Sequence, residues 1–173
     1  MLNKAIFWDR DRTLNTVPEG QEYVYKMQDL HLYPDVVPIL YLAKSFGYIN
    51  IIISNQSGIA KDLYSESQLY QFNMMLQVLT KNLIADGFYC KHQKSDNCSC
   101  RKPRPGLIFV AAHLHNIDLS NSICIGDQER DIEAGISAGI GTTILLDREG
   151  LNPKTKASSK IRDLTSLAHF LNK

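Results

Sequence analysis

Two aspartates separated by one residue are the first feature of the chain that could do chemistry. Asp9 and Asp11 follow a short apolar run over residues 5–8, which is typical of a buried strand. If the backbone stays extended, their side chains point the same way and face one site. Paired carboxylates need a cation or a shared proton, and Mg²⁺ prefers such oxygen ligands. A carboxylate in this setting can attack phosphorus and form an aspartyl-phosphate, although a polar turn after a strand gives the same pattern.

Polar side chains also follow two later apolar runs. Residues 49–53 are nearly all β-branched, as a central parallel strand should be. The residues that follow them could bind an oxyanion or simply form a turn: Ser54, Asn55, Gln56 and Ser57. The run over residues 122–125 ends at Gly126 and Asp127, a candidate third carboxylate for a metal. Asp131 lies one helical turn further, where an acid also suits the start of a helix.

Four metal-ligand residues crowd into residues 90–100: Cys90, His92, Cys98 and Cys100. Three thiolates and one imidazole make a closed tetrahedral set, the usual composition of a structural zinc site. A cluster of this kind in an intracellular protein favours a metal over disulfides. Incidental cysteines in a flexible loop are the alternative. Cys124 lies apart from the cluster, and we expect it to be buried and inert.

A basic segment follows the cysteines directly. It contains Arg101, Lys102 and Arg104, together with Pro103 and Pro105. The prolines stiffen the backbone and would hold the cations in place. A rigid lysine is a suitable point charge for a phosphate, and an arginine can fork onto a second group. A solvated basic turn would show the same composition.

Length and composition limit the classes of protein to which the chain can belong. The chain has 173 residues and a formal net charge of +1, which suits one domain over residues 1–173 and indicates neither a nucleic-acid nor a membrane partner. The N-terminal residues do not resemble a signal peptide, and no apolar stretch is long enough to span a bilayer. We expect a soluble, cytoplasmic monomer.

The remaining pattern predicts the elements that position these residues. Apolar spacing and end signals indicate helices and one further strand: helices over residues 36–46, 66–84, 107–115 and 164–171, and a strand over residues 142–146. Gly47 would end the first helix, and Ser65 with Gln68 forms a capping box before the second. We expect Met74, Met75, Leu76, Val78 and Leu79 in the core. The loop over residues 13–28 could cover the site through Glu22 and Tyr23, or could be a plain connection.

Taken together, these motifs resemble the haloacid dehalogenase superfamily of phosphatases. The resemblance rests on Asp9-Arg10-Asp11-x-Thr13, Ser54, Lys102 and Gly126-Asp127 with Asp131, and it covers almost the whole chain in order. The cysteine loop and Cys100-Arg101-Lys102-Pro103 are similar to the zinc-loop branch, which holds the heptose bisphosphate phosphatases and the bacterial histidinol-phosphatases. The resemblance implies an α/β fold, a Rossmann-like three-layer α/β/α sandwich with a central, mainly parallel sheet and no large cap domain.

The resemblance also implies a role for each motif. Asp9 would be the nucleophile and Asp11 the general acid/base. Mg²⁺ would be held by Asp9, Asp127 and either the carbonyl or the carboxylate of Asp11. Ser54 and Lys102 would stabilise the transferred phosphoryl group, with Asp131 in a supporting place. Candidate substrate-binding residues are Arg12, Glu22, Tyr23, Asn55, Gln56, Ser57, Arg101 and Gln128.

Three positions depart from these relatives. Arg12 stands where they usually have glycine, which would allow a tight turn. Ser54 replaces a frequent threonine and keeps the hydroxyl, whereas Gln128 replaces a frequent lysine and weakens one inferred substrate contact.

The sequence is consistent with two alternative substrates, and a third interpretation is a protein that is not an enzyme. The segments 55–60 and 101–106 look more like the heptose enzymes, whereas the short span from His92 to Cys98 and residues 147–149 look more like the histidinol-phosphate enzymes. Arg12, Arg101 and Arg104 suit a substrate that keeps a second phosphate after hydrolysis, so we expect a heptose bisphosphate. The third interpretation is a zinc-loop binding protein in which Arg12 has disabled the site.

Overall fold

Strand β1 (Lys4–Trp8) lies near the middle of a six-stranded sheet. The structure is a computed structural model that describes residues 2–151 and 154–171. The strand order is β3-β2-β1-β4-β5-β6, and every neighbouring pair is parallel. The other strands are β2 (Tyr48–Asn55), β3 (Asp86–Cys90), β4 (Ile123–Gly126), β5 (Thr142–Leu146) and β6 (Ser159–Ile161). The order reverses at β1, and this is where open α/β sheets bind ligands, outside the carboxyl ends of the strands.

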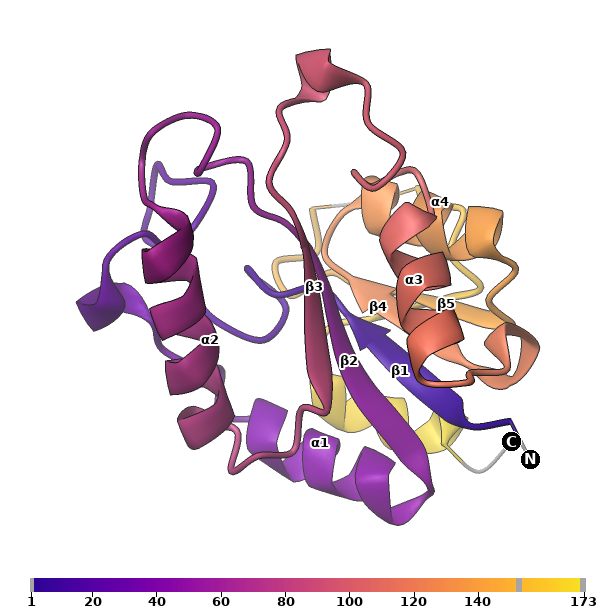
Figure 1. The fold of residues 1–173 in the computed structure, drawn as a ribbon. Helices are drawn as coiled ribbons and strands as arrows, with labels where there is room; N and C mark the ends of the chain where they lie inside the picture. Colours follow the sequence, from indigo (N-terminus) through magenta and orange to yellow (C-terminus); the bar gives the residue numbers. More distant parts are fainter. Residues whose placement is uncertain (1, 152–153, 172–173) are drawn as a thin grey trace.

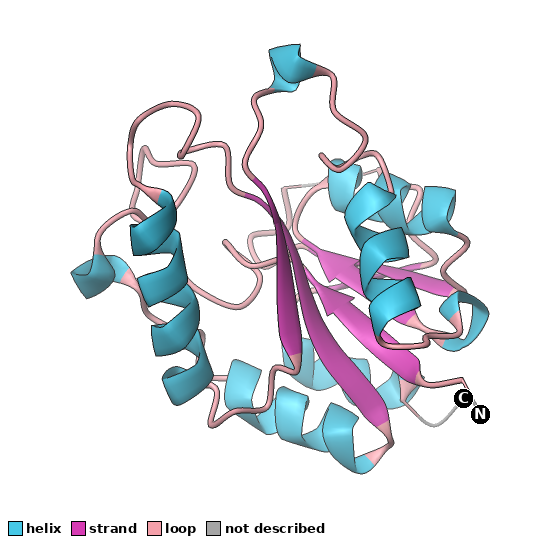
Figure 2. Ribbon diagram, viewed as in Figure 1, coloured by secondary structure: helices cyan, strands magenta, loops and turns pink. Residues whose placement is uncertain are grey.

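Helices cover both faces of the sheet, which confirms the three-layer α/β/α architecture (Figures 1 and 2). The α-helices are α1 (Val36–Ser45), α2 (Glu66–Leu79), α3 (Gly106–Leu114) and α4 (Glu129–Ala138). Short 3-10 helices are η1 (Met27–Asp29), η2 (Lys94–Asp96), η3 (Leu119–Asn121) and η4 (Leu164–Phe170). Among the described residues, no helix combines the length and the apolar character needed to cross a membrane.

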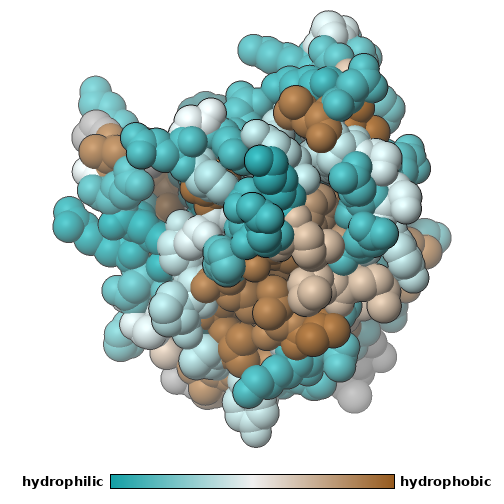
Figure 3. Space-filling view, turned by 90° about the vertical axis from the view of Figure 1, so that its left-hand side faces the viewer, coloured by the Kyte–Doolittle hydropathy of each residue, from teal (hydrophilic) through white to brown (hydrophobic). Residues whose placement is uncertain are grey.

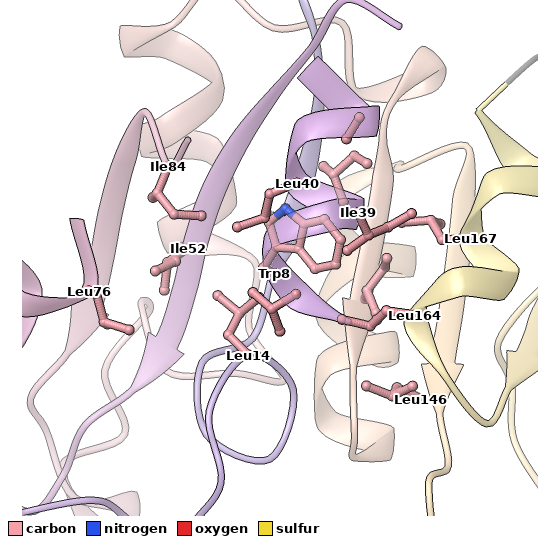
Figure 4. Packing of buried hydrophobic residues seen from close by; sticks show 14 of the residues in the cluster. Trp8, Leu14, Ile39, Leu40, Ile52, Leu76, Ile84, Leu146, Leu164 and Leu167 are labelled. Carbon is pink, nitrogen blue, oxygen red and sulfur yellow. The ribbon is translucent and has the colours of Figure 1, made fainter. Parts of the chain in front are cut away.

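Side chains along β1 point alternately to the two faces of the sheet, which explains why the core has two layers. Ile6 and Trp8 point to the face that packs against α1, α2 and η4, whereas Ala5 and Phe7 point to the face covered by α3 and α4. This follows from the two-residue period of a strand. Trp8 is fully buried, and its indole Nε1 donates to Asn50 Oδ1 at 3.1 Å (Figure 4). The last residue of β1 is therefore fixed in the core immediately before Asp9.

Two predicted helix ends are confirmed by the caps. Ser65 and Gln68 form the expected capping box of α2. Gly47 follows α1 with a φ of 81°, the left-handed conformation that glycine adopts at little cost.

Helix α2 differs from the prediction in its length and in its outer face. It ends at Leu79 rather than at residue 84, because Lys81 and Asn82 adopt positive φ. Met74, Met75 and Val78 are 51%, 38% and 69% exposed, so their expected place in the core was wrong. Met74 lines a surface hollow together with Ile84 and Tyr89, beside the edge of the sheet. Figure 3 shows that this side of the molecule carries a patch of hydrophobic surface.

Strands β3 and β6 were absent from the prediction, and they form the two edges of the sheet. The predicted closing helix is present as the 3-10 helix η4. Its buried Leu164 and Leu167 still pack on the α1 face of the sheet, as an apolar helix there should.

Candidate active site

The carboxyl end of β1 delivers Asp9 into a buried site. The Asp9 N–H donates to Ile125 O at 2.9 Å, so the backbone is still paired to β4 at this residue. The chain then turns tightly, because Leu14 and Asn15 both donate to the carbonyl of Arg10. Arg12 lies in this turn with a φ of 63°. The left-handed backbone explains why a glycine would fit there.

Three carboxylates converge beside this turn. Asp9, Asp127 and Asp131 each place an oxygen within 4.8 Å of the others. Asp131 comes from the first turn of α4, and its Oδ2 accepts from the N–H of Gln128 at 3.0 Å. Gly126 permits this approach, since a Cβ at that position would lie 2.3 Å from the Asp131 Cβ. Asp131 therefore caps the helix and also belongs to the site.

Lys102 lies between two of these acids. Its Nζ is 2.6 Å from Asp9 Oδ1 and 2.7 Å from Asp131 Oδ1, and it donates to the carbonyl of Ile53 at 2.7 Å. Only 4% of the residue is exposed. Burial alone would lower the pKa of Lys102, but the carboxylates of Asp131 and Asp9 outweigh it and hold that pKa above its ordinary value. The lysine is therefore a fixed positive charge.

The environment of the acids fits a metal ion. Burial raises the pKa of Asp9 to about 6 although Lys102 opposes the rise, and the nearby Asp131 adds to it. Burial likewise raises the pKa of Asp127 to about 7, and the charges of Asp9 and Asp131 add to it. Buried like charges of this kind are relieved by a cation, and a set of carboxylate oxygens suits Mg²⁺.

Asp11 faces a different set of partners. Its carboxylate accepts hydrogen bonds from Arg10 Nη2 at 3.0 Å, from Asn15 Nδ2 at 3.0 Å and from Gln56 Nε2 at 2.8 Å. Gln56 also donates to Ser54 Oγ at 2.9 Å and accepts from the hydroxyl of Tyr64. The three acids that lie together are therefore Asp9, Asp127 and Asp131, while the Asp11 carboxylate is held by amides and a guanidinium.

Several predicted substrate-binding side chains are engaged by the protein. Asn55 bonds both main-chain groups of Lys102, accepting from its N–H at 3.0 Å and donating to its carbonyl at 3.1 Å. The hydroxyls of Ser57 and Tyr23 share a buried hydrogen bond of 2.7 Å. Glu22 is exposed and pairs with Lys61 at 2.6 Å. Loop 13–28 and the segment after β2 are thus joined beside the site.

The other predicted side chains belong to three different segments of the chain. Arg12 Nη2 donates to the carbonyl of Gln21 at 2.6 Å, which ties the tight turn to loop 13–28. Arg101 Nη1 donates to the carbonyl of His92 at 3.2 Å. Gln128 is the N-cap residue of α4.

Arg10, Asn15 and Tyr64 were missed by sequence reasoning. Arg10 stands between the two aspartates, and this position was the one signal that could have found it. No sequence pattern distinguishes Asn15 and Tyr64 from ordinary turn and core residues.

The cysteine loop brings its four candidate ligands together. The sulfurs of Cys90, Cys98 and Cys100 lie 3.4–3.7 Å apart, and His92 Nδ1 is 3.3 Å from Cys100 Sγ. Sulfurs bound tetrahedrally to zinc at the usual bond length would lie about 3.8 Å apart. All four cysteines of the chain are free. Cys124 is buried as expected, and burial raises the pKa of its thiol to about 12.

Comparison with known proteins places the chain in a family. A HAD-hydrolase-like family model matches residues 99–165. A heptose 1,7-bisphosphate 7-phosphatase of Burkholderia mallei, named for the α-anomer, is 32% identical and aligns over 99% of this chain and 95% of its own length. This chain belongs to the HAD-like phosphatases. A Helicobacter pylori relative of this phosphatase, named for the β-anomer, is 40% identical over 83% of this chain and 84% of its own.

A solved structure shows the same fold as this HAD-like phosphatase. The heptose 1,7-bisphosphate phosphatase of B. bronchiseptica, complexed with magnesium and phosphate, superposes with a TM-score of 0.86. The two proteins are 24% identical, and the match covers 98% of each chain. The predicted superfamily and fold are both confirmed, and the chain is a phosphatase.

Proposed function

We propose that this phosphatase removes the 7-phosphate of D-glycero-D-manno-heptose 1,7-bisphosphate and that Asp9 is its nucleophile. The observation that carries the proposal is the buried Asp9 carboxylate at the carboxyl end of β1, held 2.6 Å from Lys102 and beside Asp127 and Asp131. The names of the relatives support the substrate, because the similar proteins of B. mallei and H. pylori are heptose 1,7-bisphosphate 7-phosphatases.

The residues that would hold the two metals follow from the chemistry of the donors. Mg²⁺ would be held by Asp9 and Asp127 with the main-chain carbonyl of Asp11, and it would supply positive charge against the phosphoryl oxygens. Zn²⁺ would be held by the three cysteines and the histidine of residues 90–100, where no ligand position stays open for catalysis. The proposed zinc is therefore structural.

The first chemical step is a transfer of the phosphoryl group to Asp9. A carboxylate oxygen of Asp9 attacks phosphorus, a new P–O bond forms, and the bond from phosphorus to the sugar oxygen breaks. The sugar oxygen leaves with a proton from Asp11, which must be protonated at this point. Lys102 and Ser54 hold the phosphoryl oxygens, and the positive charge of Lys102 lets the anionic nucleophile approach.

The second step regenerates the nucleophile. A water molecule gives its proton to Asp11 and attacks the phosphorus of the aspartyl-phosphate. The bond between phosphorus and the Asp9 oxygen breaks, and inorganic phosphate leaves. Asp11 thus donates a proton in one half of the cycle and accepts one in the other, as microscopic reversibility requires.

The nucleophile is tested by Asp9→Asn, which removes the attacking charge while nearly keeping the shape. We expect hydrolysis to fall on the order of 10³-fold or more, as for the loss of other catalytic nucleophiles. Asp62→Asn is the matched control, because it changes an exposed carboxylate outside the site. Circular dichroism should show both variants folded. Substantial Mg²⁺-dependent hydrolysis by folded Asp9→Asn would contradict the assignment.

The substrate is tested by kinetics on two compounds side by side. We expect a higher kcat/KM for heptose 1,7-bisphosphate than for histidinol phosphate, because the cations near the site suit a second phosphate rather than an amine. A clear preference for histidinol phosphate would refute the proposed substrate but would not contradict the proposed mechanism. A folded protein that hydrolyses neither compound, nor a generic phosphate ester, would support the non-catalytic interpretation.

A further inference from the structure

The side-chain amide of Gln56 joins two groups that have different tasks in the proposed mechanism. Its Nε2 donates to Asp11 Oδ2 at 2.8 Å and to Ser54 Oγ at 2.9 Å. Asp11 lies in the turn after β1, and Ser54 belongs to β2. A single NH₂ group therefore connects the proposed proton donor to the proposed phosphoryl-binding hydroxyl.

Gln56 lies behind the groups that meet the substrate. The residue is fully buried. Its backbone N–H donates to the carbonyl of Cys90 at 2.7 Å, so the main chain is still tied to β3 just beyond the end of β2. The side chain thus starts from a fixed backbone and reaches the site only through Asp11 and Ser54.

The partners of the amide determine which of its ends faces the site. An ionised carboxylate can only accept hydrogen bonds, so the NH₂ group must face Asp11. The amide oxygen accepts from the hydroxyl of Tyr64. Burial raises the pKa of Tyr64, so this hydroxyl keeps its proton and donates. Both ends of the Gln56 amide are therefore satisfied in one orientation.

The bond to Ser54 leaves the serine hydroxyl able to donate. A hydroxyl has one O–H donor and two acceptor lone pairs. Because the oxygen of Ser54 accepts from Gln56, its own hydrogen can be given to another acceptor. A phosphoryl oxygen is the acceptor that the reaction supplies, so Gln56 sets the direction of donation at this position.

The bond to Asp11 joins two segments of the site. Arg10 and Asn15 also donate to the Asp11 carboxylate, but they belong to the same turn as Asp11. Gln56 donates from the segment after β2, which is the neighbour of β1 in the sheet. Without this amide, the turn that carries Asp11 would lose its link to Ser54.

We infer that Gln56 is a positioning residue that holds the acid/base Asp11 and the phosphoryl-binding Ser54 in a fixed relation. The inference rests on the proposed function, because the roles of Asp11 and Ser54 come from it. Gln56 takes no proton and contacts no reacting atom. It acts through the two side chains to which its amide donates.

The test compares two leaving groups. Wild type and Gln56→Glu are assayed with p-nitrophenyl phosphate and with phenyl phosphate. The p-nitrophenolate anion is stable and needs little help from an acid, whereas the more basic phenolate depends on the proton from Asp11. Gln56→Glu keeps the shape of the side chain and loses both N–H donors. We expect it to lower kcat/KM by roughly 10-fold for p-nitrophenyl phosphate, through Ser54, and by roughly 100-fold for phenyl phosphate, through both groups.

Matched variants separate positioning from a loss of structure. Gln71→Glu makes the same change at an exposed position of α2 and should alter neither value. Gln56→Met, which has a similar length and no charge, should reproduce the losses of Gln56→Glu. In a double-mutant cycle on p-nitrophenyl phosphate, Ser54→Ala combined with Gln56→Glu should lose clearly less than the product of the two single losses, because both changes act through one hydroxyl. Circular dichroism should show every variant folded.

Three results would overturn the inference. Equal losses on the two substrates would mean that Gln56 does not act on Asp11. Losses that multiply in the double variant would mean that it does not act through Ser54. A folded Gln56→Met with the kcat/KM of wild type would mean that the amide is not needed at all.

A failure of the proposed function looks different from a failure of this inference. It appears as hydrolysis retained by Asp9→Asn, or as heptose bisphosphate that wild type leaves intact. Neither result involves the Gln56 variants, and the aryl phosphates test those variants whichever sugar phosphate is the natural substrate.

Discussion

At the scale of single residues, Asn55 has a role that its type alone does not suggest. Its amide closes two hydrogen bonds on the main chain of Lys102, a residue that lies 47 positions further along the sequence. The lysine charge is therefore positioned from the end of β2. The amide is buried and offers one acceptor and one donor to the two main-chain groups, so an apolar side chain would leave both groups without this partner.

We predict that Asn55→Ala lowers both activity and stability. The free energy of unfolding should fall by about 1–3 kcal/mol, because a buried donor and a buried acceptor lose their partner. The rate constant kcat should fall by roughly 10-fold or more as Lys102 loosens. Urea denaturation and steady-state kinetics measure the two effects, with the exposed Asn121→Ala as control. An unchanged kcat would mean that Asn55 is not needed to position the lysine.

Arg12 offers a test of backbone strain. Its φ of 63° is left-handed, which costs a residue with a Cβ roughly 1–2 kcal/mol. Both Arg12→Gly and Arg12→Ala lose the hydrogen bond to Gln21, so the difference between them reports the backbone alone. We predict that the free energy of unfolding of Arg12→Gly is about 0.5–1 kcal/mol higher than that of Arg12→Ala. The difference is smaller than the full strain, because glycine has greater conformational freedom in the unfolded chain. Equal stabilities in urea would argue against strain at this turn.

The motif residues could be found from the sequence, but the partners of each could not. Asp9, Asp11 and Asp127 follow apolar runs, and this pattern alone predicts acids at the carboxyl end of a sheet. That Asp131 joins Asp9 while the Asp11 carboxylate bonds Arg10 and Gln56 depends on side-chain directions. Sequence spacing specifies positions on elements and leaves these directions open.

At the scale of elements, the cysteine loop connects β3 to α3 and supports Lys102 from the outside. Arg104 bonds the carbonyl of Cys98, and the N–H of Gly106 donates to the carbonyl of Ser99. A metal that closes the four-ligand set would therefore stiffen the segment that carries the lysine.

We predict about one tightly held Zn²⁺ per chain, from the four-ligand composition. Cys98→Ser should weaken zinc binding by at least about 10-fold, and it should lower activity although no ligand touches the substrate. Cys124→Ser should keep the zinc, because Cys124 lies outside the cluster. Elemental analysis of protein purified without chelator measures this, and a zinc-free wild type would refute it.

The elements that escaped prediction share a physical cause. Strand β3 begins with Asp86-Gly87, a pair that normally marks a turn, and it lies at the edge of the sheet. Strand β6 has only three residues, too few for a period to show. Strand β2 was predictable because tertiary contacts on both faces select apolar residues throughout. Helix α1 was predictable because its buried residues recur at helical spacing on one face.

At the scale of the whole molecule, the site draws on distant parts of the chain. Asp9, Ser54 and Asp127 lie at or just after the carboxyl ends of β1, β2 and β4, which are neighbours in the sheet. Lys102 reaches them from the segment before α3. Because neighbouring parallel strands end at the same edge of the sheet, four short motifs separated by tens of residues meet in one site. The same rule allowed the sequence alone to predict that they would meet.

Trp8 gives the molecule a built-in optical reporter. It is the single tryptophan of the chain, it is fully buried with its Nε1 bonded to Asn50, and it immediately precedes the nucleophile. Its fluorescence should be blue-shifted in the folded protein and should shift to longer wavelength on unfolding, because the indole moves from an apolar core into water. Titration with Mg²⁺ or phosphate should change the emission intensity without any label. An emission maximum that is identical in native protein and in urea would show that the indole is already solvated.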